Sequence, residues 1–80
     1  MRVDVLLFAS LKDELGPCVS VEVDEPATVT TLRRALEAVH PLIARFGTRA
    51  KLAVNEAWAR ETDPVAAGDT VALLPPVAGG

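Results

Sequence analysis

Few side chains in this sequence have nucleophilic or acid–base chemistry. There is one cysteine, Cys18, and one histidine, His40, with Ser10 and Ser20 as the serines and no tyrosine. A Cys18–His40 couple could in principle activate a thiolate. Cys18 is more simply a small apolar residue of a strand, and the ring nitrogens of His40 suit the negative end of a helix. A catalytic pair is therefore the weaker interpretation.

The acidic residues and the glycines do not indicate a catalytic or phosphate-binding site either. Asp24-Glu25, just before a predicted helix, fits turn chemistry better than an acid/base pair. Gly16, Gly47 and Gly68 are isolated turn residues, and a phosphate loop needs a glycine-rich run. A lone cysteine supplies neither an internal disulfide nor a zinc site. We therefore expect no bound metal or cofactor.

The chain end offers a different chemistry, because its reactive group would be the terminal carboxylate. The last residues are Pro75-Pro76-Val77-Ala78-Gly79-Gly80. Two prolines stiffen the base of this tail, and the extended tail reaches roughly 20 Å. Glycine lacks a Cβ, so the Gly80 carboxylate could approach a nucleotide or a nucleophile closely inside a narrow tunnel. A frayed terminus or an arbitrary chain boundary is the competing interpretation.

Alternating apolar residues predict a first pair of strands. Residues 2–8 and 18–24 each alternate between an apolar and a more polar face, and Gly16-Pro17 marks a turn between them. Because the two segments are close in sequence, a hairpin with a long loop is the economical pairing. The second segment, with Val19, Val21 and Val23 on one side, is typical of a strand with one solvated face.

A helix should follow the second strand. Pro26-Ala27-Thr28 opens it, and the hydroxyl of Thr28 is suited to accept a free N–H of the first turn. Its apolar stripe is Val29, Leu32, Leu36 and Val39. The helix should end at His40, since Pro41 disfavours helical geometry in the residue before it.

The remaining segments complete one small domain. Residues 41–45 can form a second helical turn that ends at Gly47. Further strands are predicted at 50–54, 57–59 and 70–74. Asn55-Glu56 is the predicted turn between the first two of these strands, and a loop is predicted between Asp63-Pro64 and Gly68-Asp69. A helix on one face of a mixed sheet is a two-layer α+β domain, and a β-grasp arrangement satisfies this order. We predict this domain over residues 1–74, with 75–80 as an extended tail.

One face of the predicted sheet is more apolar than a solvated face should be. If Val3, Val5 and Leu7 face the helix, then Leu6 and Phe8 face outward. If Val71 and Leu73 also face the helix, Ala72 and Leu74 face outward too, and Trp58 is a further candidate for the same apolar patch. An exposed apolar patch usually marks a partner surface, and aromatic residues commonly anchor it. The alternative is that the chain after Thr48, or residues 59–68, folds over these side chains.

Composition and charge limit the classes of partner. Half of the 80 residues are hydrophobic, which argues against disorder. The net charge is −3, with 11 acidic and 8 basic residues and no basic stretch, so no nucleic-acid partner is expected. A mildly acidic surface suits a protein that presents Lys or Arg. The lone cysteine indicates a reducing, cytoplasmic setting, and the apolar run 5–9 is too short to span a membrane.

The sequence resembles the small subunit of molybdopterin synthase, a family of ubiquitin-like sulfur carriers. The matching segments extend over essentially the whole chain, and they are Val5-Leu6-Leu7-Phe8-Ala9, Leu11-Lys12, Glu14-Leu15-Gly16, Pro26, Thr28-Val29, Leu32-Arg33, Ala53-Val54-Asn55 and residues 68–80. The most specific match is the ending, where a Gly-Asp turn and a strand precede Pro-Pro-Val, one small residue and a terminal Gly-Gly. A Gly-Gly end alone would be less specific, because many ubiquitin-like proteins share it.

The resemblance implies a β-grasp fold and a chain that is not an enzyme on its own. An ATP-dependent adenylating enzyme would convert the Gly80 carboxylate into an acyl-adenylate, and sulfur from a persulfide donor would displace AMP to leave a thiocarboxylate. The large catalytic subunit of molybdopterin synthase would receive the tail and would hold the pyranopterin substrate. ATP would be consumed by the activating enzyme, so the chain itself would bind no cofactor.

The resemblance also assigns roles to individual residues. Gly79 and Gly80 correspond to the tail that is charged with sulfur. The docking positions are Phe8, Trp58 and Leu74, with Lys12 where the family often has a basic residue near the partner, and Leu6 joins them from the apolar patch. The chain departs from the family pattern at Leu73-Leu74, where relatives can carry aromatic residues, and at Trp58, where an aliphatic residue is common.

Three other functions remain open from the sequence. The chain could carry sulfur for another pathway, such as thiamine thiazole synthesis or tRNA thiolation, although the Pro-Pro-Val stretch favours molybdopterin. It could be a ubiquitin-like modifier, which would use the same adenylate to form isopeptide bonds with lysines. It could also be an adaptor with a passive tail.

Overall fold

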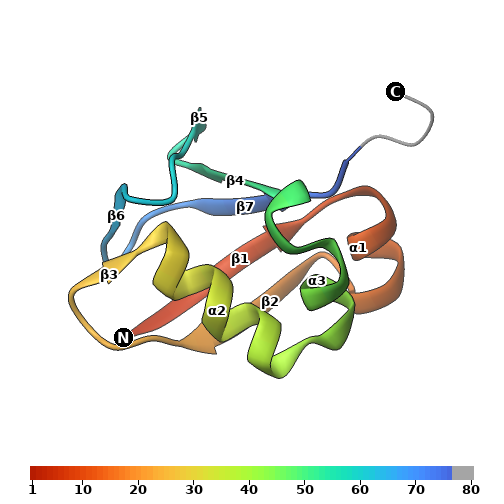
Figure 1. The fold of residues 1–80 in the computed structure, drawn as a ribbon, viewed down its shortest axis with the longest axis horizontal. Coiled ribbons are helices and arrows are strands. Elements are labelled where there is room, and N and C mark those ends of the chain that lie inside the picture. The colour runs from red at the N-terminus through yellow and green to blue at the C-terminus, as the bar shows by residue number, and fades with distance from the viewer. Residues whose placement is uncertain (77–80) are drawn as a thin grey trace.

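A computed structural model describes residues 1–76, and residues 77–80 lie outside the described part. A five-stranded sheet is covered on one face by helices (Figure 1). Its strands are β1 (Arg2–Leu7), β2 (Cys18–Glu22), β4 (Lys51–Val54), β5 (Ala57–Trp58) and β7 (Val71–Leu74). The helices are α1 (Ala9–Leu15), α2 (Val29–Val39), α3 (Pro41–Phe46) and the 3-10 helix η1 (Gly47–Arg49). Two short strands, β3 (Ala27–Thr28) and β6 (Pro64–Val65), pair separately.

The strand order in the sheet is β2-β1-β7-β4-β5. The central strand, β7, is parallel to its neighbour β1, and every other neighbouring pair in this sheet is antiparallel. A mixed sheet with its main helix on one face is the two-layer β-grasp arrangement predicted from the element order, and that prediction is confirmed. The predicted hairpin of the first two strands is also confirmed, and the predicted strand ends differ by one or two residues.

The core lies between the sheet and α2. Val3, Val5 and Leu7 of β1 alternate inward with at most 4% exposure. Burying each such side chain contributes about 1.5–3 kcal/mol relative to leaving it in water. The same layer contains Leu11, Val21, Val23, Ala27, Val29, Leu32, Leu36, Ile43, Ala50, Leu52, Val65, Val71 and Leu73. The strict alternation in β1 fixes which of its side chains remain on the other face.

The main helix begins and ends as predicted, but the last residue of its predicted apolar stripe is not buried. Thr28 Oγ1 accepts a hydrogen bond from the backbone N–H of Thr31 at 3.3 Å, so the predicted N-cap is confirmed. Val39, predicted to belong to the buried stripe, is 61% exposed. The helix stops there because the chain turns at His40-Pro41, and Ile43 of α3 supplies the next buried side chain.

Four short elements, α1, β3, β6 and η1, were not predicted. The long loop of the first hairpin contains α1, whose single buried side chain, Leu11, is too little for a helical period to show. Pro26-Ala27-Thr28 was expected to open the helix, but Ala27 and Thr28 form β3 and pair with Val65 and Pro64 of β6. The predicted loop after Asp63 is therefore partly a strand, held by a distant segment that local sequence patterns do not reveal.

The predicted turn at Asn55-Glu56 is confirmed and joins β4 to β5 directly. Both residues have positive φ angles, 53° and 69°, a combination that favours Asn-Gly. At Asn55, side-chain hydrogen bonds offset the steric cost of the positive φ angle. The side chain donates to Asp69 Oδ1 at 3.1 Å and accepts from the Thr70 N–H at 2.9 Å. Glu56 holds a Cβ in the same left-handed region, which costs roughly 1 kcal/mol.

We expect Glu56→Gly to raise the free energy of unfolding by about 1 kcal/mol, because glycine adopts the positive φ without a steric cost. Urea denaturation followed by circular dichroism measures this change. Asn55→Gly is the matched control, since it keeps the backbone permissive but removes both hydrogen bonds to the 69–70 segment. A Glu56→Gly variant less stable than the parent would contradict this account of the turn.

Candidate functional site

A row of side chains crosses the whole sheet on the face opposite the core. The strand registers pair Cys18 with Leu6, Leu6 with Ala72, Ala72 with Ala53, and Ala53 with Trp58. Each of these residues alternates with an inward-facing neighbour, so all five point away from α2. The outer face therefore has a continuous band of small and apolar side chains across its middle.

Two further residues extend this band toward one end of the sheet. Leu7 pairs with Leu73, so Phe8 and Leu74 follow side by side at the next position. We call the set Leu6, Phe8, Ala53, Trp58, Ala72 and Leu74 the outer patch. Leu6, Phe8 and Trp58 are 42%, 43% and 69% exposed, so the 59–68 segment does not fold over them. The structure thus brings Leu6, Phe8, Trp58 and Leu74 onto one face, and their docking role stays a prediction.

The other half of the outer face is polar. Ser20 Oγ donates to Asp4 Oδ1 at 2.5 Å, and Arg2 Nε donates to the same oxygen at 3.1 Å. The hydrogen bond from Ser20, and then that from Arg2, hold the pKa of Asp4 below its ordinary value. This cluster forms the boundary of the outer patch on the side away from Phe8 and Leu74.

The outer patch lies at the end of the sheet from which the C-terminal segment leaves. Because β1 and β7 are parallel, their C-terminal ends lie at the same end of the sheet, and α1 follows β1 there (Figure 1). Lys12, the basic residue predicted near a partner, is exposed on α1. Pro75 is half-buried and Pro76 is exposed just past β7. The predicted tail residues Val77, Ala78, Gly79 and Gly80 lie outside the described residues.

The structure does not bring the only cysteine and histidine together. Cys18 begins β2 and is exposed on the outer face, whereas His40 lies between α2 and α3 in the helical layer. The sheet therefore separates the two side chains that a thiolate couple would require. Residues 1–76 form no pocket, and none of the helices described for them is long and apolar enough to cross a membrane.

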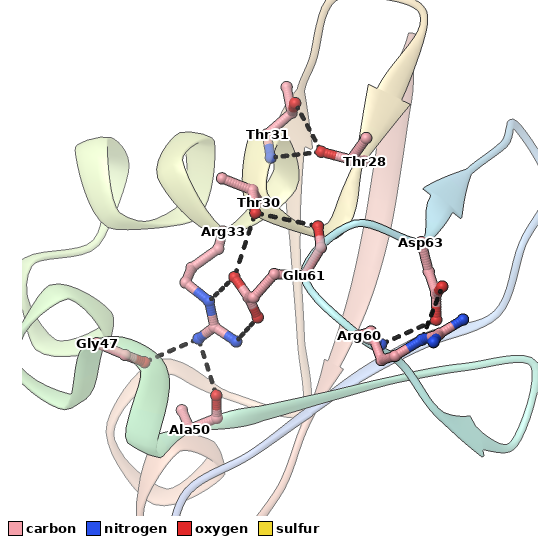
Figure 2. Close-up of polar contacts among 9 residues, drawn as sticks. All are labelled: Thr28, Thr30, Thr31, Arg33, Gly47, Ala50, Arg60, Glu61 and Asp63. Atoms are coloured by element: carbon pink, nitrogen blue, oxygen red, sulfur yellow. Dashed lines mark hydrogen bonds and ion pairs between the residues drawn. The ribbon is translucent and has the colours of Figure 1, made fainter.

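An ion pair between a buried arginine and a partly exposed glutamate fixes the segment that follows Trp58 (Figure 2). Arg33 on α2 is only 5% exposed and donates from Nε and Nη2 to the two carboxylate oxygens of Glu61, at 3.1 and 2.9 Å. Its Nη1 donates to the carbonyls of Gly47 and Ala50, each at 2.8 Å. One guanidinium thus joins α2, the start of β4 and the segment after β5. This role of Arg33 was not predictable from the sequence, because an arginine in a helix usually faces solvent.

Backbone contacts strengthen the same junction. The N–H groups of Val29 and Thr30 have no acceptor within the helix, because they belong to its first turn. They donate instead to the carbonyls of Asp63 and Glu61, at 3.0 and 3.1 Å. The Thr30 hydroxyl also donates to the Glu61 carbonyl at 3.0 Å. The hydrogen bonds from Arg33 lower the pKa of Glu61 below its ordinary value of 4.5. The carboxylate is therefore held in its charged form against the helix.

Fold and surface together define a ubiquitin-like β-grasp protein whose exposed apolar face adjoins the base of its C-terminal segment. The sequence matches the ThiS family over residues 5–80. The chain belongs to this family, among the ubiquitin-like sulfur carriers.

Three relatives illustrate the similarity. The molybdopterin synthase sulfur carrier subunit of Dictyostelium discoideum is 35% identical over 95% of this chain and 93% of its own. Small archaeal modifier protein 1 of Haloferax volcanii has a TM-score of 0.80 and 35% identity, with 95% of this chain and 98% of that chain covered. A complex of subunits 1 and 2 of the molybdopterin-converting factor of Helicobacter pylori contains a chain with a TM-score of 0.69 and 26% identity, and both chains are fully covered.

We expect Arg33→Met to lower the free energy of unfolding by about 2 kcal/mol, because two carbonyls and a carboxylate lose their shared donor. Arg34→Met, an exposed neighbour on the same helix, is the matched control and should change stability by less than about 0.5 kcal/mol. Urea denaturation of both variants and the parent measures these differences.

The cost of Arg33→Met should also depend on pH. A depressed folded-state pKa means that the carboxylate of Glu61 contributes stability above its unfolded pKa and loses that contribution as the pH falls through the folded value. The difference between the parent and Arg33→Met should therefore be smaller at about pH 3 than at about pH 7. If the free energies of unfolding of the parent and of Arg33→Met differ equally at the two pH values, the Arg33–Glu61 ion pair does not contribute to stability.

Proposed function

We propose that this chain carries sulfur as a thiocarboxylate on Gly80 and delivers it within molybdopterin synthase. The observation that supports this most is the outer patch, which extends to Leu74, the last strand residue before Pro75-Pro76 and the glycine end. A partner that covers the patch would receive the tail at a fixed starting point. The relative from Dictyostelium discoideum is a molybdopterin synthase sulfur carrier subunit, which supports the same pathway.

The chemistry would begin with activation of the terminal carboxylate. An oxygen of Gly80 attacks the α-phosphorus of ATP on an adenylating enzyme, which releases pyrophosphate and leaves an acyl-adenylate. The terminal sulfur of a persulfide then attacks the acyl carbon and displaces AMP, forming an acyl disulfide. A second thiol of the donor cleaves its S–S bond, so the donor is oxidised to a disulfide and Gly80 retains a thiocarboxylate. That sulfur is a soft nucleophile, like a thiolate.

Delivery would depend on the large subunit, which would supply the active site and bind the pyranopterin. The H. pylori complex of subunits 1 and 2 of the molybdopterin-converting factor supports a partner of this kind for the present chain. The chain itself would provide a docking surface and a reactive end, and it would be non-catalytic. We propose that the domain comprises residues 1–74 and that residues 75–80 act as the tail, in a cytoplasmic setting.

A second candidate function is attachment to other proteins. The similarity to the H. volcanii protein named a small archaeal modifier supports it. The acyl-adenylate would be the same, but a lysine amine would displace AMP and leave an isopeptide bond. A carrier for another sulfur pathway would share the thiocarboxylate and differ only in the acceptor.

We expect incubation with an adenylating enzyme, ATP and a persulfide donor to replace one oxygen of Gly80 by sulfur. Intact-mass spectrometry detects the change, and a variant lacking Gly80 is the control. Should the mass stay constant while the chain is folded, every carrier interpretation fails. High-molecular-weight conjugates that disappear in the Gly80 deletion would instead support the modifier function.

We expect Phe8→Asp to weaken docking to the large subunit at least tenfold, because a charge would be buried against an apolar surface. Val39→Asp is the matched control, since Val39 is also an exposed apolar residue but belongs to α2 on the other side of the sheet. Isothermal titration calorimetry measures both affinities. Equal affinity of the two folded variants would mean that the outer patch does not dock.

A further inference from the structure

Two basic residues stand beside the outer patch at its β4–β5 edge. Lys51 pairs with Leu74 and alternates with the buried Leu52, so it faces outward with the patch. Ala53 pairs with Trp58, and the Ala59 N–H donates to the Leu52 carbonyl at 3.0 Å. Continued one step beyond these contacts, the same register brings Arg60, which follows the end of β5, opposite Lys51. Lys51 is two residues before Ala53, and Arg60 is two residues after Trp58. By the alternation of side chains, both cations therefore occupy the next outward position beside the outer patch.

Three carboxylates around this edge, those of Glu61, Asp4 and Asp63, are already engaged, and Glu56 stands in the β4–β5 turn, at the opposite end of this hairpin from Lys51. Glu61 turns inward onto Arg33, and Asp4 bonds Arg2 and Ser20 in the polar half of the face. Asp63 contacts Arg60, with 3.6 Å between Oδ1 and Nε, but the Arg60 side chain is 87% exposed, so this pair is weak. Lys51 forms no ion pair with any residue of the 1–76 range.

This local charge is opposite in sign to that of the whole chain. A net charge of −3 favours a partner that presents basic groups. The edge of the outer patch nearest Leu74 presents cations instead. A partner that contacts the patch meets these local charges at close range, whereas charges beyond about 8–10 Å are screened at physiological salt.

We propose that the protein surface that receives the outer patch carries carboxylates opposite Lys51 and Arg60, at the rim of an apolar recess for Phe8, Leu74 and Trp58. This inference rests on the proposed function and adds the chemistry of the partner. Apolar contacts in the patch hold the complex, while the rim charges accelerate encounter and fix orientation. Lys51, next to Leu74, sets the orientation at the base of the tail.

Zero-length cross-linking tests the contact directly, with the large subunit of molybdopterin synthase from the same organism as the probe. A water-soluble carbodiimide joins an amine to a carboxylate only when the two touch. Lys12 and Lys51 are the only lysines in the chain, so peptide mapping separates their products. We expect a cross-link from Lys51 to an Asp or Glu of the partner. Lys51→Arg keeps the charge but should lose this cross-link while binding normally.

Association kinetics provide an independent measurement. Trp58 is the only tryptophan in this chain and lies in the patch, so its fluorescence reports docking in stopped-flow experiments when the partner signal is subtracted. The double variant Lys51→Gln, Arg60→Gln should associate roughly tenfold more slowly at low salt and approach the parent at high salt. Arg34→Gln, Arg45→Gln is the matched control, because it removes the same charge from exposed positions of α2 and α3.

The outcomes separate this inference from the proposed function. If the parent does not bind the large subunit at all, the proposed function fails and the inference fails with it. If the parent binds but gives no Lys51 cross-link, and the two double variants associate alike, only the acidic rim is refuted. Faster association after removal of Lys51 and Arg60 would also refute it, because the partner would then present basic groups.

Discussion

The parallel pairing of β1 with β7 is the constraint on which the outer patch depends. Parallel neighbouring strands have their C-terminal ends at the same end of the sheet. Phe8, just after β1, and Leu74, at the end of β7, therefore lie side by side. An antiparallel pairing would send the C-terminal segment away from Phe8. The chain thus gathers an aromatic side chain, an aliphatic side chain and the base of its C-terminal segment at one place, although Phe8 and Leu74 are more than sixty residues apart in sequence.

The helical layer then fixes the rest of that surface from behind. The guanidinium of Arg33 binds the carbonyls of Gly47 and Ala50, which come just before β4, and the carboxylate of Glu61, which comes just after β5. It therefore holds both ends of the β4–β5 hairpin. The short edge strand β5 has few ladder hydrogen bonds of its own, so its position depends on these anchors and on the Asn55 turn. The ionic contact that Arg33 makes from the helical layer therefore helps to place Trp58 on the outer face.

Much of this fold was predictable because its strongest signals are local. Alternation in β1 and β2, the Thr28 cap, the Pro41 stop and the Asn55-Glu56 turn all depend on neighbouring residues, and each is confirmed. The features that were missed depend on distant partners: β3 exists only because β6 pairs with it, and Arg33 is buried only because Glu61 arrives from another segment. The exposed patch was predictable from the surplus of apolar residues on both faces, whereas the cations beside it required the strand registers.

A surface of this size has consequences for how a carrier works. The outer patch has only six residues, two of them alanine, whereas a standard stable interface uses about 20–30 residues and roughly 800 Å² per partner. Under the proposed function the carrier must leave after discharge, and a small apolar contact with charges at its rim permits rapid association and rapid release. The reactive end then adds binding only in a partner that has a channel for it. Specificity would thus depend on two weak recognitions, the patch with its rim and the tail, that must be satisfied together.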